Sequence, residues 1–188
     1  MTLALKEWPA AIEALGKGES ILLFRKGGIR ENGGFQLPSH RAFLLPSFEH
    51  QRENLLKCSD LKASPKPYQV NEPISIQYWV KIFQLLELKT ADCISKLRTF
   101  HIWTDEFLQQ RLAWKPERPL YALLCQTYKL PEPVIVPYQQ EYGGCRSWIH
   151  IKDAIAFDPN YPVMPVERFQ TEAAHINTLL EHLESPKQ

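Results

Sequence analysis

Ile74-Ser75-Ile76-Gln77-Tyr78-Trp79-Val80-Lys81-Ile82 is the stretch that decides the fold class of this chain. Large apolar side chains occupy every second position, and polar residues fill most of the positions between them. Because successive side chains of a strand point to opposite faces, this alternation predicts a long strand with one buried face. Such strands are typical of antiparallel sheets, whereas strands of a parallel sheet are usually buried on both faces.

Further elements are predicted on both sides of this strand. A helix begins near Trp8, with Pro9 in its first turn and with Gly16 and Gly18 at its end. The other predicted strands are Ser20–Lys26, Arg41–Leu45, Pro119–Tyr128, Val134–Val136 and Ser147–Ile151, and the other predicted helices are Phe48–Leu56, Thr90–Leu97, one capped by Thr104, and Val166–Leu183. This order favours the α+β class, with a mixed or antiparallel curved sheet or small barrel, peripheral helices and a C-terminal helix.

Composition limits the possible kinds of protein. The chain has 188 residues, of which 44% are hydrophobic and 23% charged, so it can form a real core. We expect one α+β domain over residues 1–157, followed by a C-terminal arm and helix over residues 158–188 that packs on it or dimerises. The formal net charge of +1 means that a nucleic-acid partner would need a local basic patch.

The sequence also predicts a location and a redox state. No apolar run reaches the ~18–20 residues that a membrane helix needs, and the start has no signal-peptide pattern, so we expect a cytoplasmic protein without a membrane partner. The cysteines are widely spaced, whereas a four-cysteine zinc site normally contains close pairs. We therefore expect reduced thiols, no metal and no cofactor.

The first candidate site follows the apolar run that begins at Ile21. The run ends in Arg25-Lys26-Gly27-Gly28, and Arg30 adds a third cation. Glycine lets the backbone approach a ligand closely, and the planar Arg25 guanidinium suits a phosphate or carboxylate. We expect the head of Arg25 to be at least partly exposed. The alternatives are a hairpin with solvated cations, or an ion pair of Arg25 with Glu31 or Glu49.

The second candidate site is Glu141–Trp148, where two glycines, a cation and a tryptophan share one turn. This combination suits backbone approach to a ligand together with stacking on a base. A tight turn with Trp148 in the core is the alternative, and Cys145 is expected to be inert rather than a nucleophile. If the two glycine turns meet, the α-carbons of Gly28 and Gly144 lie within about 25 Å. The predicted ligand-binding or phosphate-binding set is Arg25, Lys26, Gly27, Gly28, Arg30, His50, Gly143, Gly144, Arg146 and Trp148.

Catalysis is left open by the sequence, and no catalytic residue is assigned. Glu87-Leu88-Lys89 has the Glu-x-Lys pattern of restriction-type nucleases, but the upstream acids Glu72 and Asp60 are not in a convincing turn. Glu49 and His50 offer a hydrolase alternative, with His50 as a general base. Whether this protein is an enzyme therefore stays undecided.

The C-terminal helix carries a heptad-like apolar pattern. Apolar residues recur at steps of three and four, which is typical of a helix that buries one stripe. The stripe can pack on its own domain, or it can form a homodimer and make the protein an oligomeric adaptor. The residues of the expected dimer interface are Val166, Phe169, Ile176, Leu180 and Leu183.

Four segments together resemble a known family. They are Trp8 to Gly18, Ile21 to Glu31, Phe43 to Gln51 and Glu141 to Trp148. They look like domain-of-unknown-function family 1802, a bacterial and especially cyanobacterial family, over about Leu5 to Ile151. The family has no established activity. Some members are joined to a restriction-type nuclease domain, which implies a connection with nucleic acid.

A more distant resemblance is to the PUA-like superfamily and its ASCH branch. That branch has a Gly-x-Lys-x-x-x-x-Arg motif, which Gly18 and Arg25 match while Ser20 replaces the lysine. The missing lysine argues against the chemistry of ASCH-type amidohydrolases. The resemblance implies a small PUA-like barrel that binds RNA or a modified base. The leading interpretation is a non-catalytic binder of RNA, DNA or a nucleotide that uses a basic, glycine-rich cleft.

Overall fold

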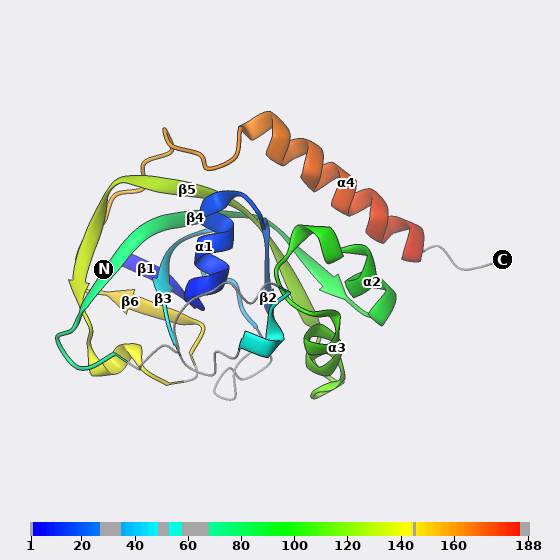
Figure 1. Ribbon diagram of the computed structural model, residues 1–188, viewed down its shortest axis with the longest axis horizontal. Coiled ribbons are helices and arrows are strands. Elements are labelled where there is room, and N and C mark those ends of the chain that lie inside the picture. Colours follow the sequence, from blue (N-terminus) through cyan, green and yellow to red (C-terminus); the bar gives the residue numbers. More distant parts are fainter. Residues whose placement is uncertain (1, 27–34, 49–52, 58–67, 145, 185–188) are drawn as a thin grey trace.

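A six-stranded sheet curls into a half-barrel, with helices on its concave side and along one end (Figure 1). The computed structural model describes residues 2–26, 35–48, 53–57, 68–144 and 146–184. The elements are β1 (Thr2–Glu7), α1 (Pro9–Lys17), β2 (Leu22–Arg25), β3 (Arg41–Pro46), η1 (Glu53–Leu55), β4 (Pro73–Leu88), α2 (Ala91–Lys96), η2 (Arg98–Phe100), α3 (Asp105–Ala113), β5 (Leu120–Pro137), η3 (Gln140–Tyr142), β6 (Trp148–Ile151) and α4 (Val166–Glu184).

The sheet is mixed, as the sequence predicts. Its strand order is β2-β5-β4-β3-β1-β6. β1 and β3 are parallel, and the other pairs are antiparallel. The long strands β4 and β5 form the backbone of the sheet, and their pairing contains two register shifts. Because such irregularities bend a strand and increase its twist, they allow the sheet to curl. The predicted class, α+β with a mixed curved sheet and a C-terminal helix, is confirmed.

The first strand was not predicted, because the sequence pattern places a helix at the start of the chain. β1 instead precedes α1 and lies between β3 and β6. Ala4 and Leu5 in β1 are fully buried. β1 is short, and its adjacent apolar residues Ala4 and Leu5 point to opposite faces, so the sequence shows no clear alternation. The strand can be recognised only from its pairing with β3 and β6. The predicted helix follows directly, and Gly18 ends it with a φ of 72°.

β5 replaces two predicted strands. The sequence separates Pro119–Tyr128 from Val134–Val136 because of the prolines between them, but β5 is continuous. One of the register shifts lies here, since Tyr78 pairs with Lys129 while Ile76 pairs with Val134. Pro131 and Pro133 therefore lie in a bulge, where a missing backbone N–H does not interrupt the regular ladder.

The predicted helix over Phe48–Leu56 is wrong in the part that the structure describes. Ser47 and Phe48 are not helical, and η1 is a single turn of 3-10 helix. Leu56 then forms an isolated bridge with Trp103. The tertiary pairing of Leu56 thus overrides the local helical pattern. Residues 49–52 lie outside the described residues.

Two predicted helix caps are present. The Thr90 hydroxyl accepts a hydrogen bond from the Cys93 N–H at the start of α2. The Thr104 hydroxyl accepts one from the Phe107 N–H at the start of α3. Each cap satisfies an amide that has no partner inside its helix.

α4 packs on the same chain. Phe169 and Ile176 are buried in the main core, and the Phe169 ring meets the Phe83 ring edge to face at 5.8 Å. The arm before the helix runs beside β5, where the Lys129 N–H donates to the Tyr161 carbonyl and the Val163 N–H donates to the Thr127 carbonyl. Two side chains of the expected dimer interface are therefore core residues. Dimerisation itself stays a prediction, as does the division at residue 157.

Candidate nucleic-acid interface

Arg25 joins two strands that are not neighbours in the sheet. A guanidinium nitrogen lies 2.6 Å from a carboxylate oxygen of Glu7 at the end of β1, and the two side chains are 13% and 4% exposed. The same guanidinium donates hydrogen bonds to the Phe24 and Lys6 carbonyls, both at 2.8 Å. The curl of the sheet brings β2 and β1 together, and Arg25 links them across this gap.

The Arg25 side chain is partly exposed, as expected, but most of its surface is covered. Among the described residues its carboxylate partner is Glu7. Glu31 and Glu49, which the sequence offered as structural alternatives, lie outside the described residues. Glu7 also accepts a hydrogen bond from the Trp8 N–H at 2.7 Å through its other oxygen. The pair thus fixes the junction between β1 and α1.

Lys6 connects Arg25 to the second predicted site. Its ammonium donates a hydrogen bond of 2.8 Å to the Gly144 carbonyl, while its own carbonyl accepts from Arg25. Gly144 has a φ of 82°, which a residue with a side chain rarely adopts. Arg25 and the Gly143–Gly144 turn therefore lie at the same corner of the fold. Gly27, Gly28, Arg30 and His50 lie outside the described residues, so the distance between Gly28 and Gly144 stays a prediction.

Lys26 and Arg111 add two more cations at this corner. Lys26 is only 1% exposed, and its ammonium donates to the Leu112 carbonyl in the last turn of α3. A cation is favourable at that end of a helix. Burial, followed by the nearby Arg111, lowers the pKa of Lys26, and Glu117 acts more weakly in the opposite direction. Burial, followed by Arg25, lowers the pKa of Arg111, and Glu7 offsets part of this effect.

These side chains form a compact group that we call the basic corner, consisting of Lys6, Glu7, Arg25, Lys26 and Arg111. All five are buried or half-buried. Four carry a positive charge and one a negative charge. Charged side chains are rarely buried, so several cations close together make this corner a candidate binding site.

An exposed tryptophan lies next to the basic corner. Trp114 directly follows α3 and is 39% exposed. The Lys115 ammonium lies 4.5 Å from the centre of its ring, and the Arg111 guanidinium carbon lies 5.6 Å from it. Both contacts are cation–π interactions. Arg111 thus belongs both to the basic corner and to this aromatic group, which we call the Trp114 platform (Arg111, Trp114 and Lys115).

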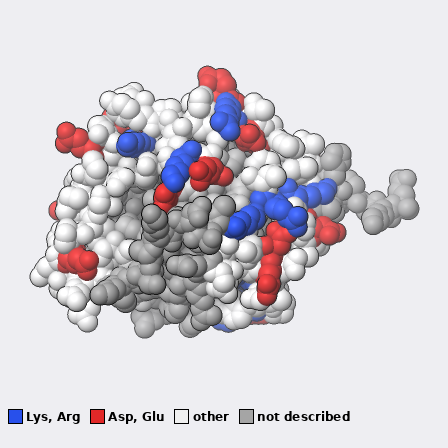
Figure 2. All heavy atoms as spheres, in the orientation of Figure 1, with Lys and Arg blue, Asp and Glu red and all other residues white. Residues whose placement is uncertain are grey.

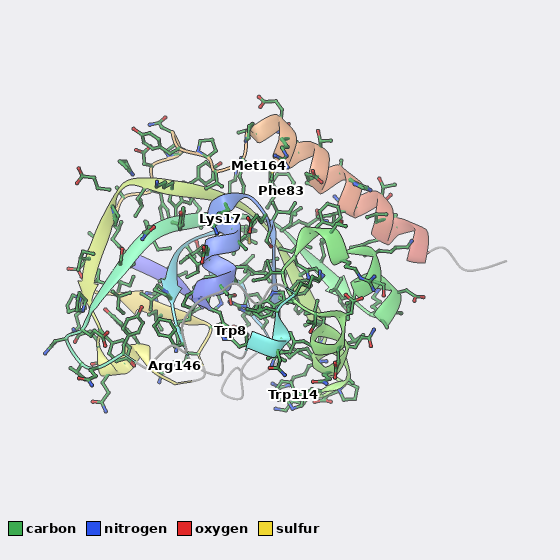
Figure 3. The ribbon with its side chains drawn as sticks, in the orientation of Figure 1. Trp8, Lys17, Phe83, Trp114, Arg146 and Met164 are labelled. Atoms are coloured by element: carbon green, nitrogen blue, oxygen red, sulfur yellow. The ribbon has the colours of Figure 1, made fainter. Side chains whose placement is uncertain are left out.

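An aromatic cluster fixes α1 relative to α3. The ring centroids of Trp8 and Trp103 are 4.9 Å apart, and Trp103 and Phe107 are 5.2 Å apart. Trp8 follows Glu7, and Phe107 lies one helical turn before Arg111. The packed rings therefore hold Glu7 and Arg111 in place. Figure 3 shows Trp8 and Trp114 on the lower part of the molecule in that view, with Arg146 on the same side.

The other predicted site residues have different surroundings. Arg146 is exposed, and its backbone N–H donates to the Gly144 carbonyl. Trp148 is half-buried, stacks on Phe35 at 6.0 Å and donates its ring N–H to the Gln36 carbonyl. One face of Trp148 is thus covered by the protein. Its proposed stacking on a base stays a prediction.

Sequence reasoning missed Lys6, Glu7, Arg111 and Trp114. Lys6 and Glu7 belong to the strand that was not predicted. The Arg111, Trp114 and Lys115 spacing is a basic and aromatic signal that could have been noticed, since such combinations are common in proteins that bind single strands.

The surface in Figure 2 carries blue and red side chains in alternation rather than one large area of a single sign. This agrees with the formal net charge of +1. On the face shown, an anion would therefore be attracted by local groups and only weakly by the field of the whole protein.

The alternative nuclease site has no further support from geometry. Glu87 is exposed near the end of β4, and Asp60 lies outside the described residues. In the described ranges, no group of three or more His, Cys, Asp or Glu residues is arranged to hold a metal ion. Glu49 and His50 of the hydrolase alternative also fall outside those ranges. Among the helices described, none has both the length and the apolar character to cross a membrane.

Comparison with known proteins identifies the family. A family model described as Domain of unknown function (DUF1802) matches residues 4–175. The chain belongs to this family. No curated protein is significantly similar in sequence.

Two solved structures are similar to this DUF1802 protein. Both are crystal structures of mutant forms of ZmASCH from Zymomonas mobilis. One is 12% identical, with 93% of this chain and 95% of that chain covered and a TM-score of 0.39. The other is 13% identical, with 92% and 96% covered and a TM-score of 0.40.

Proposed function

We propose that this DUF1802 protein binds a phosphate-bearing ligand, a nucleotide or a single-stranded nucleic acid, at the basic corner and the Trp114 platform. One observation carries the proposal. Three buried or half-buried cations, Arg25, Lys26 and Arg111, lie close enough to act on one another, and Arg25 is paired with Glu7. The role is binding, without a chemical step.

The imbalance of charge favours an anionic ligand. Glu7 can neutralise one cation, and it is already paired with Arg25. Burial and neighbouring positive charge lower the pKa of Lys26 and of Arg111, which means that the charged forms of both groups are destabilised. An anion that contacts these groups would stabilise their charged forms. Phosphate suits them because guanidinium groups can bind it with two hydrogen bonds.

The Trp114 platform adds a preference for a base over a simple anion. An aromatic ring that is 39% exposed offers a surface on which a base can stack. Stacking of this kind contributes about 1–3 kcal/mol per base. Since Arg111 lies at the ring and at the basic corner, it connects the expected position of a base to that of a phosphate.

Binding of a fluorescein-labelled 12-nucleotide single-stranded DNA, measured by anisotropy at low salt, tests the proposal. Arg111→Ala should weaken binding about tenfold or more, the equivalent of losing one charged contact. The control is Lys129→Ala, which removes an exposed cation from β5. Its effect should stay within about twofold.

Melting temperatures of both variants separate binding from folding. Equal losses of affinity in the two variants would mean that binding is a general charge effect, and the proposal would be wrong. The same conclusion follows if the unmodified protein does not bind the oligonucleotide. Sodium tripolyphosphate as a competitor should displace the DNA, because it occupies the same cations.

A further inference from the structure

A separate cleft of about 690 Å³ lies between four parts of the chain: the end of α1, the segment that joins α1 to β2, η2, and α4. Its volume falls in the range of small-molecule sites. In Figure 3, Lys17 and Met164, which both line the cleft, are labelled in the upper part of the molecule, away from Trp114. The cleft contains Gly18, Glu19 and Ser20, the segment in which the ASCH lysine is replaced.

The floor of the cleft is apolar and partly aromatic. Ile21, Phe100 and Met164 line it and are all less than one tenth exposed. The Phe100 and His175 rings meet at 83° with their centroids 5.6 Å apart. An aromatic ring and a thioether form a favourable surface for the hydrocarbon part of a ligand, and the face of the ring also attracts a cation.

Carboxylates outnumber cations at the rim of the cleft by three to two when Glu13, the partner of Lys17, is counted with the lining. Lys17 lies at the rim but is paired with Glu13 at 2.6 Å, outside the cleft lining. Glu19 and Glu172 also line the cleft; Glu19 acts on Lys17 more weakly than Glu13 does, and in the described ranges neither carboxylate forms a direct ion pair. The C-terminal end of α1 adds a partial negative charge. Arg168 is the opposing cation on this rim.

We propose that this cleft binds a small organic ammonium ion. Its apolar body would lie on Phe100 and Met164, and its ammonium group would lie near Glu172 and Glu19. The cleft and the basic corner lie at opposite ends of β2. Ile21, which lines the cleft, immediately precedes this strand, and Arg25 of the basic corner ends it. The charge preferences of the two sites are opposite.

Benzylamine, benzyl alcohol and benzoate make a matched set of probes, since they share a ring and differ in charge. Each would be titrated into the ¹⁵N-labelled full chain, with the Gly18 amide as reporter. Benzylamine should bind with the highest affinity and shift this amide. Glu172→Gln should weaken benzylamine binding about fivefold. Arg168→Gln should strengthen it, because it removes the opposing charge.

Glu181→Gln is the matched control, since it makes the same change at an exposed position of α4 outside the cleft. It should leave benzylamine binding unaltered. Equal or tighter binding of benzoate would overturn the proposal, as would the absence of any benzylamine-dependent shift at Gly18. An equal loss of benzylamine affinity in the Glu172 and Glu181 variants would assign the effect to general surface charge, and it would also overturn the proposal.

Discussion

Replacing Glu7 by glutamine is the most informative single change in this protein. The substitution keeps the size of the side chain and an oxygen that can accept from the Trp8 N–H, but it removes the charge that faces Arg25. The two side chains are 4% and 13% exposed. Breaking a buried ion pair from one side costs about 3–5 kcal/mol, because it leaves the other charge uncompensated. We expect a value near the lower end, since Arg25 keeps two carbonyl acceptors.

The same change should increase the affinity for an anion. Without Glu7, Arg25 and Arg111 lose the carboxylate that acts on both of them, so an added polyphosphate would replace the missing charge. A ligand that binds only the folded state stabilises it by about 2.7 kcal/mol at one hundred times its dissociation constant. Glu7→Gln should therefore recover most of its lost stability in sodium tripolyphosphate, and gain more from it than the unmodified protein.

Urea unfolding at low ionic strength, with and without tripolyphosphate, measures both effects. Glu13→Gln is the control, because its ion pair with Lys17 is at the surface, where such pairs contribute about 1 kcal/mol or less. Equal stabilisation of the unmodified protein and Glu7→Gln by tripolyphosphate would refute the reasoning. So would a Glu7 variant that is as stable as the Glu13 variant in buffer alone.

Three further changes test other parts of the structure. Trp114→Ala should weaken binding of the 12-nucleotide DNA by about 1–3 kcal/mol in an anisotropy titration and leave tripolyphosphate binding unaltered, since only the stacking surface is lost. Burial lowers the pKa of His101 to about 3, and the nearby Lys57 adds to this effect. As pH falls below about 6.5, His101 is therefore protonated in the unfolded state before it is protonated in the folded state, and the folded state loses stability. Between pH 6.5 and 5, the free energy of unfolding measured with urea should fall by roughly 2 kcal/mol, and His101→Asn should make this fall smaller. An identical fall in the variant would assign the acid sensitivity to other groups. Ile176→Ala should lower the free energy of unfolding by about 2–5 kcal/mol, because this side chain is fully buried in its own chain. Sedimentation should show an unchanged oligomeric state. Loss of an oligomer without loss of stability would instead support the dimer interpretation.

The fold could be predicted from the sequence where side chains repeat with a clear period. The alternation from Ile74 to Ile82 predicts β4, and the threonine caps predict α2 and α3. β1 was missed because Thr2–Glu7 is short and defined by its neighbours in the sheet. β5 was divided because a proline usually ends a strand, whereas here Pro131 and Pro133 lie in a bulge.

The candidate site could be predicted only in part. Arg25 and the Gly143–Gly144 turn both contact Lys6, but the predicted meeting of the two glycine turns stays a prediction, because Gly27 and Gly28 lie outside the described residues. The partners of Arg25 could not be predicted, because Glu7 comes near it only through the curl of the sheet. Arg111 is brought in by α3, whose position depends on the packing of Trp8, Trp103 and Phe107. No local pattern in the sequence contains these long-range contacts.

The salt dependence of DNA binding tests the central claim most directly. The logarithm of the association constant of a single strand falls against the logarithm of salt concentration with a slope of about −0.7 for each phosphate neutralised. Engagement of Lys26, Arg111 and Lys115 predicts a slope of about −2 for the 12-nucleotide DNA. Arg111→Ala should reduce that slope by about 0.7. A slope near zero, or a slope that Arg111→Ala leaves unaltered, would contradict binding of phosphate at the basic corner.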